Sequence, residues 1–439
     1  TSMLRCVKTN DIKLKKLVYL YLITNSVKEP EQAIMSVSAF VSDASDLNPV
    51  VRALAVRTMC RIRLESVAEN FILPLRKTLK DSDPYVRKTA AMGVLKLYDT
   101  IPDAVENSQI FGDLVSLLSD ENPLVVSNAV AAVIEINEHR TTPIFQLTPS
   151  NISPVLNAIA SSGEWCQVYL FDALARYKPA EKEDAVFLIE RLIPFLRHKN
   201  AAVVIGAFKS IYVFLDYHPQ PQELFAQILP PFITLVSASD PEIQFVVLRT
   251  ISLFVQKYPR ALAREIRYFF CMYNDPSYVK MEKLDIIVSI CTPQTAQIVL
   301  DEFAEYSNGV DVAFVRKTIR ALGQIALRIE AAARRCVDIL ISLIRGHADY
   351  AVEEAVIVAC DILRKFPGVF DSIIAVVCEG LGNITEPEAR AAAIWVLGEY
   401  SGKIENVEVL LDGFIDSFRD EQPVVQLQLL SALVKAESS

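Results

Sequence analysis

Glycine, tryptophan and histidine are scarce in this 439-residue sequence, which contains 13 Gly, 2 Trp and 4 His. Few glycines leave few positions for tight turns or for a positive φ angle, so a fold of many short strands is disfavoured. The hydrophobic fraction is nevertheless 52%, enough for an extensive core. This combination predicts a protein built of helices.

Long apolar runs and paired cysteines are also missing. No run reaches the roughly 18–20 residues that a membrane-spanning helix needs, and no signal-peptide core follows Arg5 and Lys8. The eight cysteines are scattered, without a C-x-x-C pair. Such spacing is typical of reduced, mostly buried thiols in a cytosolic protein.

Motifs for catalysis are absent as well. The G-x-G at 380–382 lacks the third glycine of a dinucleotide loop, and neither a phosphate-binding loop nor a G-x-S-x-G elbow occurs. The His and Cys residues are not clustered as metal ligands, and Glu353 and Glu354 are neighbours on a predicted helix, so their side chains point apart. The sequence therefore predicts no enzyme, no cofactor and no metal site.

The charge is uneven along the chain. The net charge of −9 argues against nucleic acid as the main partner, yet residues 1–100 carry 16 Lys/Arg and 10 Asp/Glu. Either these are ordinary solvated helix faces, or the N-terminal part approaches an anionic surface such as a membrane leaflet or an acidic partner. Whether Lys13, Lys15 and Lys16 touch phosphoinositides is left open.

One motif recurs along the whole chain: Asp or Asn, then Pro, then x-Val-Arg or a variant, then an Ala-rich apolar stretch. Ten copies begin at Asn48, Asp83, Asn122, Asn200, Asp240, Asp275, Val312, Asp349, Glu386 and Gln422, and a degenerate one lies near Glu164. Pro49 and Pro423 are 374 residues apart, so ten intervals average about 37 residues. This period is close to that of HEAT and armadillo units.

Each part of the motif has a physical role at a helix start. The Asp or Asn side chain caps free N–H groups, and proline fits the first helical position. The arginine, as in Arg52 and Arg87, is expected to lie along the seam between repeats and bond the acid of a neighbouring turn. The other helix of each unit precedes the motif, as segment 71–79 does before Asp83.

A single helix pair cannot bury its apolar face, but stacked pairs can. We therefore expect an all-α fold, a right-handed α-α superhelix of the HEAT/armadillo type. Residues 1–439 would form one solenoid domain of about eleven helix pairs. Because both ends lie within the repeat pattern, we expect either a piece of a longer protein or one that docks partners at its ends. Solenoids are protein-binding scaffolds, but the repeat does not identify the partner.

Five segments are more particular than a generic repeat: LKKLVYLYL at 14–22, PVVRALAVRTM at 49–59, LRKTLKDSDPYVRKTAA at 75–91, YNDPSYVKMEKLDI at 273–286 and ARAAAIWVLGEY at 389–400. They resemble β-adaptin, the β-type large chain of clathrin-associated heterotetrameric adaptor complexes. The similarity runs from about residue 11 to residue 435 and covers the trunk of that family.

The resemblance implies a scaffold subunit in protein transport, vesicle-mediated trafficking and endocytosis. It implies pairing with a second large adaptin chain, and with medium (μ-type) and small (σ-type) chains. Its location would be peripheral, on Golgi or endosomal membranes or plasma-membrane coated pits, and the choice between these stays open. Because the family's N-terminal helices, clathrin-binding hinge and appendage are not in this sequence, this fragment alone is not expected to bind clathrin strongly.

Two docking sites can be carried over from the resemblance. In members recruited by Arf-type GTPases, the GTPase docks on an early helix at positions that match Ile34 and Val37. The alternative is that both are core residues, with Met35 and Phe40 competing for the buried stripe.

The second site concerns the closed state of the family. There, a Val and a Tyr of the β chain plug the tyrosine-signal pocket of the medium chain, and they match Val310 and Tyr350. The alternative is that these are ordinary exposed loop residues. As a plug, they would make cargo binding a population shift, in which cargo and membrane favour the open state.

Rival functions remain. A solenoid nuclear transport receptor of the importin kind carries Trp-Asn ladders, and two tryptophans, Trp165 and Trp395, weigh against that class. A lyase-like or kinase-linked enzyme with a helical appendage is disfavoured by the missing motifs, and another HEAT-repeat scaffold stays open.

Overall fold

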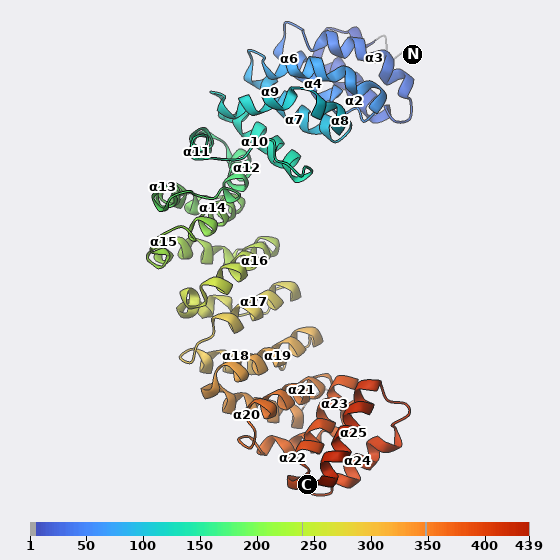
Figure 1. The fold of residues 1–439 in the computed structure, drawn as a ribbon, viewed down its shortest axis with the longest axis vertical. Helices are drawn as coiled ribbons and strands as arrows, with labels where there is room; N and C mark the ends of the chain where they lie inside the picture. Colours follow the sequence, from blue (N-terminus) through green and yellow to red (C-terminus); the bar gives the residue numbers. More distant parts are fainter. Residues whose placement is uncertain (1–5, 239, 347–348, 439) are drawn as a thin grey trace. The chain divides into compact units, whose positions relative to one another are not determined.

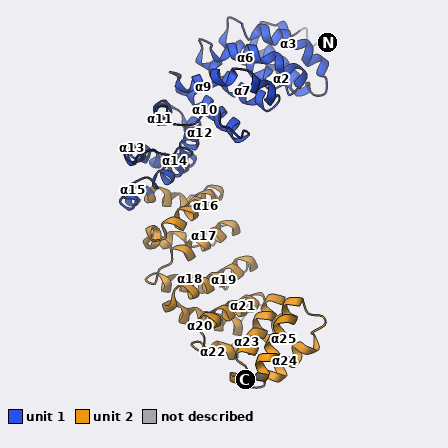
Figure 2. Ribbon diagram, viewed as in Figure 1, with its two compact units in different colours: residues 1–228 blue, residues 229–439 orange. Residues whose placement is uncertain are grey.

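The computed structural model describes residues 6–238, 240–346 and 349–438, and these form a succession of helices without any strand (Figure 1). Two compact units divide the chain into residues 1–228 and 229–439 (Figure 2), and the division falls inside helix α15 (Pro221–Thr234). The all-α solenoid prediction is confirmed, whereas the single-domain organisation of residues 1–439 stays a prediction.

Unit 1 consists of helix pairs in two rows. The helices that begin with the repeat motif pack each against the next, and every one of them also packs against the helix that precedes it in the chain. The motif helices are α4 (Pro49–Met59), α7 (Pro84–Tyr98), α10 (Pro123–Glu138), α12 (Glu164–Ala175) and α14 (Ala201–Phe214). The preceding helices are α3 (Pro30–Asp43), α6 (Ile72–Leu79), α9 (Ile110–Ser116), α11 (Ile152–Ser161) and α13 (Lys182–Leu192). Helix α2 (Ile12–Asn25) packs on α3 and α4, and the short α5 (Glu65–Ala68) and α8 (Pro102–Asn107) lie in connections.

Unit 2 repeats this arrangement. Its motif helices, which also pack one on the next, are α16 (Pro241–Lys257), α17 (Ser277–Ile290), α19 (Val312–Arg328), α21 (Asp349–Lys365), α23 (Pro387–Glu399) and α25 (Pro423–Ser438). They alternate with the 3-10 segment η6 (Pro259–Phe269) and with α18 (Ala296–Tyr306), α20 (Glu330–Gly346), α22 (Ser372–Glu379) and α24 (Val407–Asp416). The described residues thus contain eleven motif helices.

The motif caps five of these eleven helices as expected, whereas Asp240 and Glu386 make no side-chain cap bond. A side-chain oxygen accepts the N–H of the residue two positions later at five helix starts, for example from Tyr85 N to Asp83 Oδ1 at 2.8 Å; the five cap residues are Asn48, Asp83, Asn122, Asn200 and Asp311. Asp275 differs, because α17 begins one residue later, with Pro276 as its N-cap. The Asp275 carboxylate instead pairs with the buried Lys283 ammonium at 2.6 Å.

The arginine of the motif donates hydrogen bonds to the backbone of the loop before its own helix. Arg52 donates to the carbonyl oxygens of Asp46 and Leu47 at 2.8 and 3.1 Å. Donors four residues after the N-cap make the same kind of contact in other repeats: Arg87, Gln167, Gln244, Lys280, Arg390 and Gln426. Lys or Gln takes the place of Arg in four of these repeats, since each offers an N–H donor on a long side chain.

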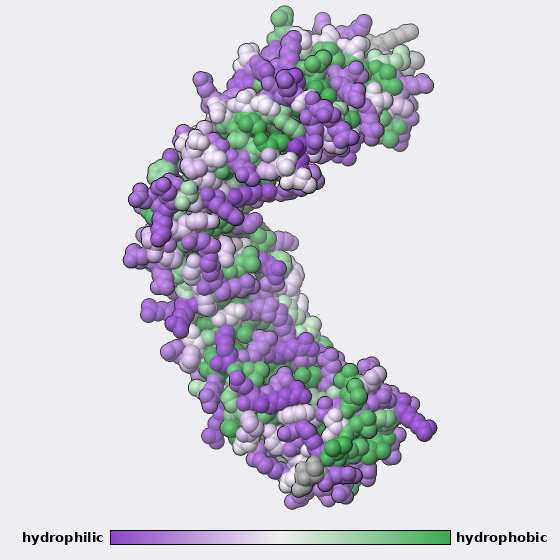
Figure 3. Space-filling view, in the orientation of Figure 1, coloured by the Kyte–Doolittle hydropathy of each residue, from purple (hydrophilic) through white to green (hydrophobic). Residues whose placement is uncertain are grey.

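The apolar face of α25 lies at the end of unit 2. Figure 3 shows a green patch over this region, and α25 exposes Val424, Leu427, Leu430 and Val434 at helical spacing. On its other side α25 packs closely on α23, because a Cβ atom at Gly398 would lie 2.7 Å from the Cα atom of Ala432.

Three further properties bear on chemistry. Within the described ranges, no helix is both long enough and apolar enough to cross a bilayer. The same residues contain no group of three His, Cys, Asp or Glu side chains that could hold a metal ion. Four of the eight cysteines are buried, and burial raises the pKa of Cys60 to about 12.

Candidate protein-docking surfaces

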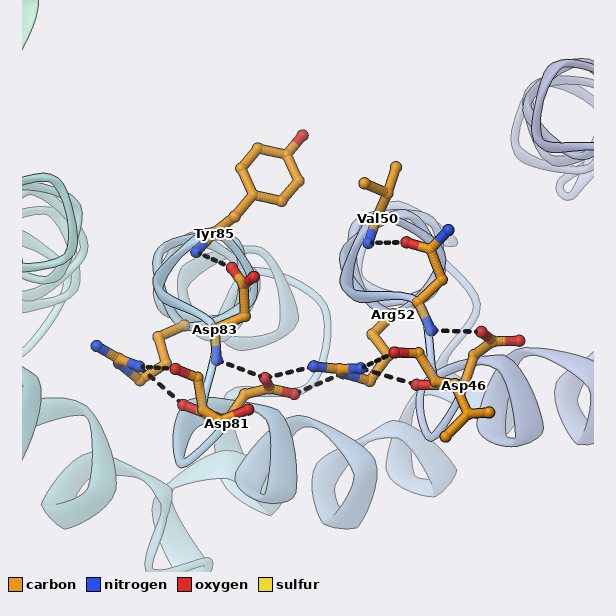
Figure 4. Close-up of polar contacts among 10 residues, drawn as sticks. Asp46, Val50, Arg52, Asp81, Asp83 and Tyr85 are labelled. Carbon is orange, nitrogen blue, oxygen red and sulfur yellow. Dashed lines mark hydrogen bonds and ion pairs between the residues drawn. The ribbon is translucent and has the colours of Figure 1, made fainter.

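A chain of arginine–aspartate contacts fixes the register of neighbouring repeats in unit 1. The Arg52 guanidinium makes two hydrogen bonds of 2.7 Å to Asp81 (Figure 4). Arg87 contacts Asp120 in the same bidentate manner at 2.7 and 2.9 Å. Asp81 also accepts the N–H of Asp83 at 2.9 Å. Each aspartate thereby orders the loop that caps its own helix and joins that loop to the previous repeat, as the sequence predicts for the motif arginine.

The stability that these arginine–aspartate contacts provide depends on pH. Burial acts to raise the pKa of the Asp120 carboxyl, but the hydrogen bonds from Arg87 and from the Asn122 N–H, with the guanidinium charge, hold that pKa below its usual range. The folded state therefore binds fewer protons than the unfolded state near pH 4. The stabilisation is complete above the ordinary carboxyl pKa and is lost as the pH falls through the lower, folded pKa.

We predict that Arg87→Ala lowers the free energy of unfolding by about 2–4 kcal/mol at neutral pH, because Asp120 stays nearly buried without its cation. Urea denaturation measures this change. Below about pH 4 the difference between wild type and variant should shrink, since a protonated Asp120 no longer needs a cation. Arg57→Ala is the control, because Arg57 is exposed and should change stability by less than about 0.5 kcal/mol. An equal loss in both variants, or a constant difference down to pH 2, would contradict the prediction.

The two residues matched to a GTPase site lie on α3, where Ala33, Ser36 and Phe40 form the buried stripe. Ile34 is 50% exposed and Val37 is half-buried. Phe40 is fully buried as the core alternative supposed, but Met35 is 67% exposed. Neither Ile34 nor Val37 is therefore a core residue, and the side chain of Ile34 is available for contact.

The two residues matched to a cargo-pocket plug lie at the starts of neighbouring helices in unit 2. Val310 is 96% exposed in the bend before α19, and Tyr350 is half-buried in the first turn of α21. Helices α19 and α21 pack side by side (Figure 1). Asp311 fixes the end of the Val310 bend, since it accepts the Ala313 N–H at 3.1 Å and the Ser277 hydroxyl at 2.7 Å.

A second polar network, in unit 2, was not expected from the sequence. Glu353 and Glu354 are 4% and 2% exposed, although each carries a carboxylate. Glu354 binds Arg320 through two contacts of 2.5 and 3.1 Å. Glu353 contacts Arg316 at 3.1 Å and accepts three hydrogen bonds of 2.8–2.9 Å from Thr385 and the Glu386 N–H.

The position of Glu353 within the repeat motif is the sequence feature that could have indicated this network. Glu353 stands four residues after the start of its motif, at the position that Arg52 and Arg87 occupy in their repeats. Arg52 at this position donates to carbonyl groups of the loop before its own helix. Glu353 is an acceptor, so it instead accepts hydrogen bonds from N–H groups of the loop in the next repeat. The two side chains serve different arginines, which agrees with the prediction that they point apart.

Comparison with known proteins identifies related sequences. A family model described as the adaptin N terminal region matches residues 1–439. The chain is 46% identical to the AP-1 complex subunit beta-1 of Mus musculus and 45% identical to the AP-1 complex subunit beta of Dictyostelium discoideum; each match covers 99% of this chain and 46% of the relative. It is 37% identical to the AP-2 complex subunit beta of Schizosaccharomyces pombe, over 96% of this chain and 62% of that protein.

The fold also has a counterpart among known structures. A chain from a homology model of the full-length AP-3 complex in an intermediate open conformation matches with a TM-score of 0.67 and 18% identity. That match covers 99% of this chain and 76% of the other. At this identity the likeness concerns the solenoid fold alone. The chain spans about half the length of the AP-1 relatives that it matches.

Proposed function

This chain belongs to the adaptin family, as a β-type large chain, and we propose that it is a scaffold subunit of a heterotetrameric adaptor complex in vesicle-mediated protein transport. The observation that carries the proposal is the family match over residues 1–439, together with 45–46% identity to AP-1 β chains along nearly the whole chain. The proposal assigns the chain no catalytic step. Its role is to hold other chains on stacked helices.

The proposed partners are a second large adaptin chain, a medium chain and a small chain. The complex would associate peripherally with Golgi, endosomal or plasma membranes, and would bind clathrin through a hinge outside residues 1–439. The rows of helices joined by arginine–aspartate contacts suit this role, because a partner that covers several repeats needs them held in one register.

Co-purification tests the assignment. A tagged chain expressed in eukaryotic cells is expected to recover a second large chain together with medium and small adaptor chains, identified by mass spectrometry. Recovery of a Ran-type GTPase with nuclear cargo, and without adaptor chains, would instead assign it to the solenoid transport receptors.

Within this function, Ile34 and Val37 form the proposed contact for an Arf-type GTPase. The support is the exposure of Ile34 and the position of Val37 one turn further along the same face of α3. An apolar side chain that is exposed in the free chain loses its contact with water when a partner covers it, so such residues are suited to be binding hot spots.

Val310 and Tyr350 form the proposed plug of the medium-chain cargo pocket. They lie at the N-terminal ends of adjacent helices, and Val310 is almost fully exposed, so its side chain has no competing contacts to break before it enters a partner. The closed complex would hold the plug in place, and cargo would have to displace it.

We predict that Val310→Ser with Tyr350→Ser raises the affinity of the assembled complex for a tyrosine-signal peptide by about fivefold or more. The reason is that the closed state loses contacts which the open state does not make. Fluorescence anisotropy with a labelled signal peptide measures the change. The control Tyr273→Ser with Val369→Ser removes an exposed Tyr and Val elsewhere in unit 2 and should leave affinity unchanged. Equal affinity in wild type and plug variant would end the proposal for this pair.

A further inference from the structure

A cavity of about 280 Å³ opens on the motif helices α4, α7 and α10 of unit 1. Arg57, Lys88 and Lys96 line it, together with Thr89 and Asn128. No residue of α3 lines the cavity, so it is separate from Ile34 and Val37. The lining residues come from three consecutive repeats, so the cavity exists only where these repeats are stacked.

The cations of this cavity lack acidic partners. Among the described residues, Arg57, Lys88 and Lys96 make no ion pair, whereas Arg52 and Arg87 on the same two helices are fully paired. Burial lowers the pKa of Lys96, and the positive charges of Arg61, Arg57 and Arg63 lower it further. A chain with a net charge of −9 thus keeps an uncompensated positive site here, and such a site attracts an anion.

Beside the cavity runs a column of exposed apolar side chains. The second residue of each motif helix is at least 40% exposed in four successive repeats: Val50, Tyr85, Leu124 and Trp165. Figure 4 shows Val50 and Tyr85 projecting in the same direction from α4 and α7. Arg57, Lys88 and Asn128 follow three to seven residues later on these helices, which places column and cavity on one face.

Tyr85 joins the two features. Its hydroxyl lies 3.4 Å from Arg57 Nη2, and the Lys88 ammonium lies over its ring, 4.8 Å from the ring centre. Neighbouring helices are typically 8–10 Å apart, and a peptide in the extended polyproline II conformation advances about 3.1 Å per residue with three residues per turn. A peptide that crosses these helices would therefore place roughly every third side chain against one member of the column.

We propose that this face binds an extended segment of a partner protein that carries a phosphorylated serine or threonine, with the phosphate in the cavity and apolar side chains on the column. A phosphate monoester carries about 1.5–2 negative charges at neutral pH and offers three acceptor oxygens, which suits a site with three cations better than a single carboxylate does. A lipid headgroup would use the cavity but would leave the column without a ligand. The peptide accounts for both features.

Fluorescence anisotropy with the whole chain tests this site. The probe is a labelled peptide of about twelve residues, with one phosphoserine among glutamates and a leucine at every third position on one side of it. Lys88→Glu with Lys96→Glu is expected to weaken binding at least about tenfold, because two charge-assisted hydrogen bonds are lost. Lys199→Glu with Lys209→Glu is the matched control: it makes the same change in charge on the same unit and should leave the Kd unchanged.

Two further arms make the test decisive. The unphosphorylated peptide should bind at least about tenfold more weakly than the phosphopeptide, and Leu124→Ser should weaken the phosphopeptide without abolishing its preference for phosphate. Lys88→Gln with Lys96→Gln, which removes charge without reversing it, covers the case in which the reversed variant fails to fold. The proposal is overturned if phosphorylation makes no difference or if the control pair loses as much affinity. It is also overturned if only phosphoinositide vesicles, and not the peptide, bind in a manner that depends on Lys88 and Lys96.

Discussion

Glu353→Ala is expected to lower the free energy of unfolding of unit 2 by about 3–5 kcal/mol. The carboxylate is 4% exposed and serves four donors in two repeats: Arg316, the Thr385 N–H and hydroxyl, and the Glu386 N–H. Burial acts to raise its pKa, yet those bonds and the Arg316 charge together hold the pKa of the folded state below its usual range. Alanine would leave all four donors without this acceptor.

Urea denaturation monitored by circular dichroism measures the loss. Glu353→Gln should lose less than alanine, because its amide oxygen still accepts a hydrogen bond although the charge is gone. Combining Glu353→Leu with Arg316→Leu should recover part of the stability, since the double variant leaves no buried charge unpaired. Glu379→Ala is the control, because Glu379 is 58% exposed in its pair with Arg345. If Glu353→Ala and Glu379→Ala were equally mild, the buried network would not support unit 2.

The network also shows which parts of the fold a repeat pattern can predict. The period, the caps at Asn48 and Asp83 and the contacts of the motif arginine follow from local rules, because each concerns one turn of helix and its loop. Glu353 breaks the pattern, since its partners are 32 and 37 residues away and its burial depends on the packing of three repeats. Local helix and turn preferences therefore do not predict the partners or the burial of Glu353.

The same limit applies to the surfaces. The exposure of Ile34 and the burial of Phe40 depend on how α3 is turned against α4, which the apolar sequence of α3 leaves ambiguous. The cationic cavity is harder still to predict, because its lining residues Arg57, Lys96 and Asn128 come from three repeats. The sequence between them also contains basic residues that are paired with acids: Arg76, Lys80 and Arg87. Whether these residues share one face depends on where each helix begins and on how the three repeats stack.

Ile34→Asp with Val37→Asp is expected to reduce recruitment of the complex to Arf-type-GTPase-loaded membranes at least about a hundredfold. Each substitution would place a carboxylate in an apolar contact that offers it no partner, so binding would have to desolvate two charges. Because Ile34 is half exposed and Val37 only half-buried, the cost to stability should be limited to about 1 kcal/mol, and the tetramer should still assemble.

Vesicle co-sedimentation with the GTPase in its GTP-bound and GDP-bound forms measures recruitment, and size-exclusion chromatography checks assembly. Leu47→Asp with Leu73→Asp is the matched control, since both leucines are at least 76% exposed on other segments of unit 1. Ile34→Asp alone distinguishes a role in GTPase binding from a role in folding, because it changes an exposed side chain and leaves the half-buried Val37 in place. GTP-dependent recruitment that survives in the folded double variant, or that falls equally in the control, would exclude this face of α3 as the GTPase contact. Its loss with the tetramer intact would assign membrane recruitment to a single turn of one helix, formed by residues that the core does not need.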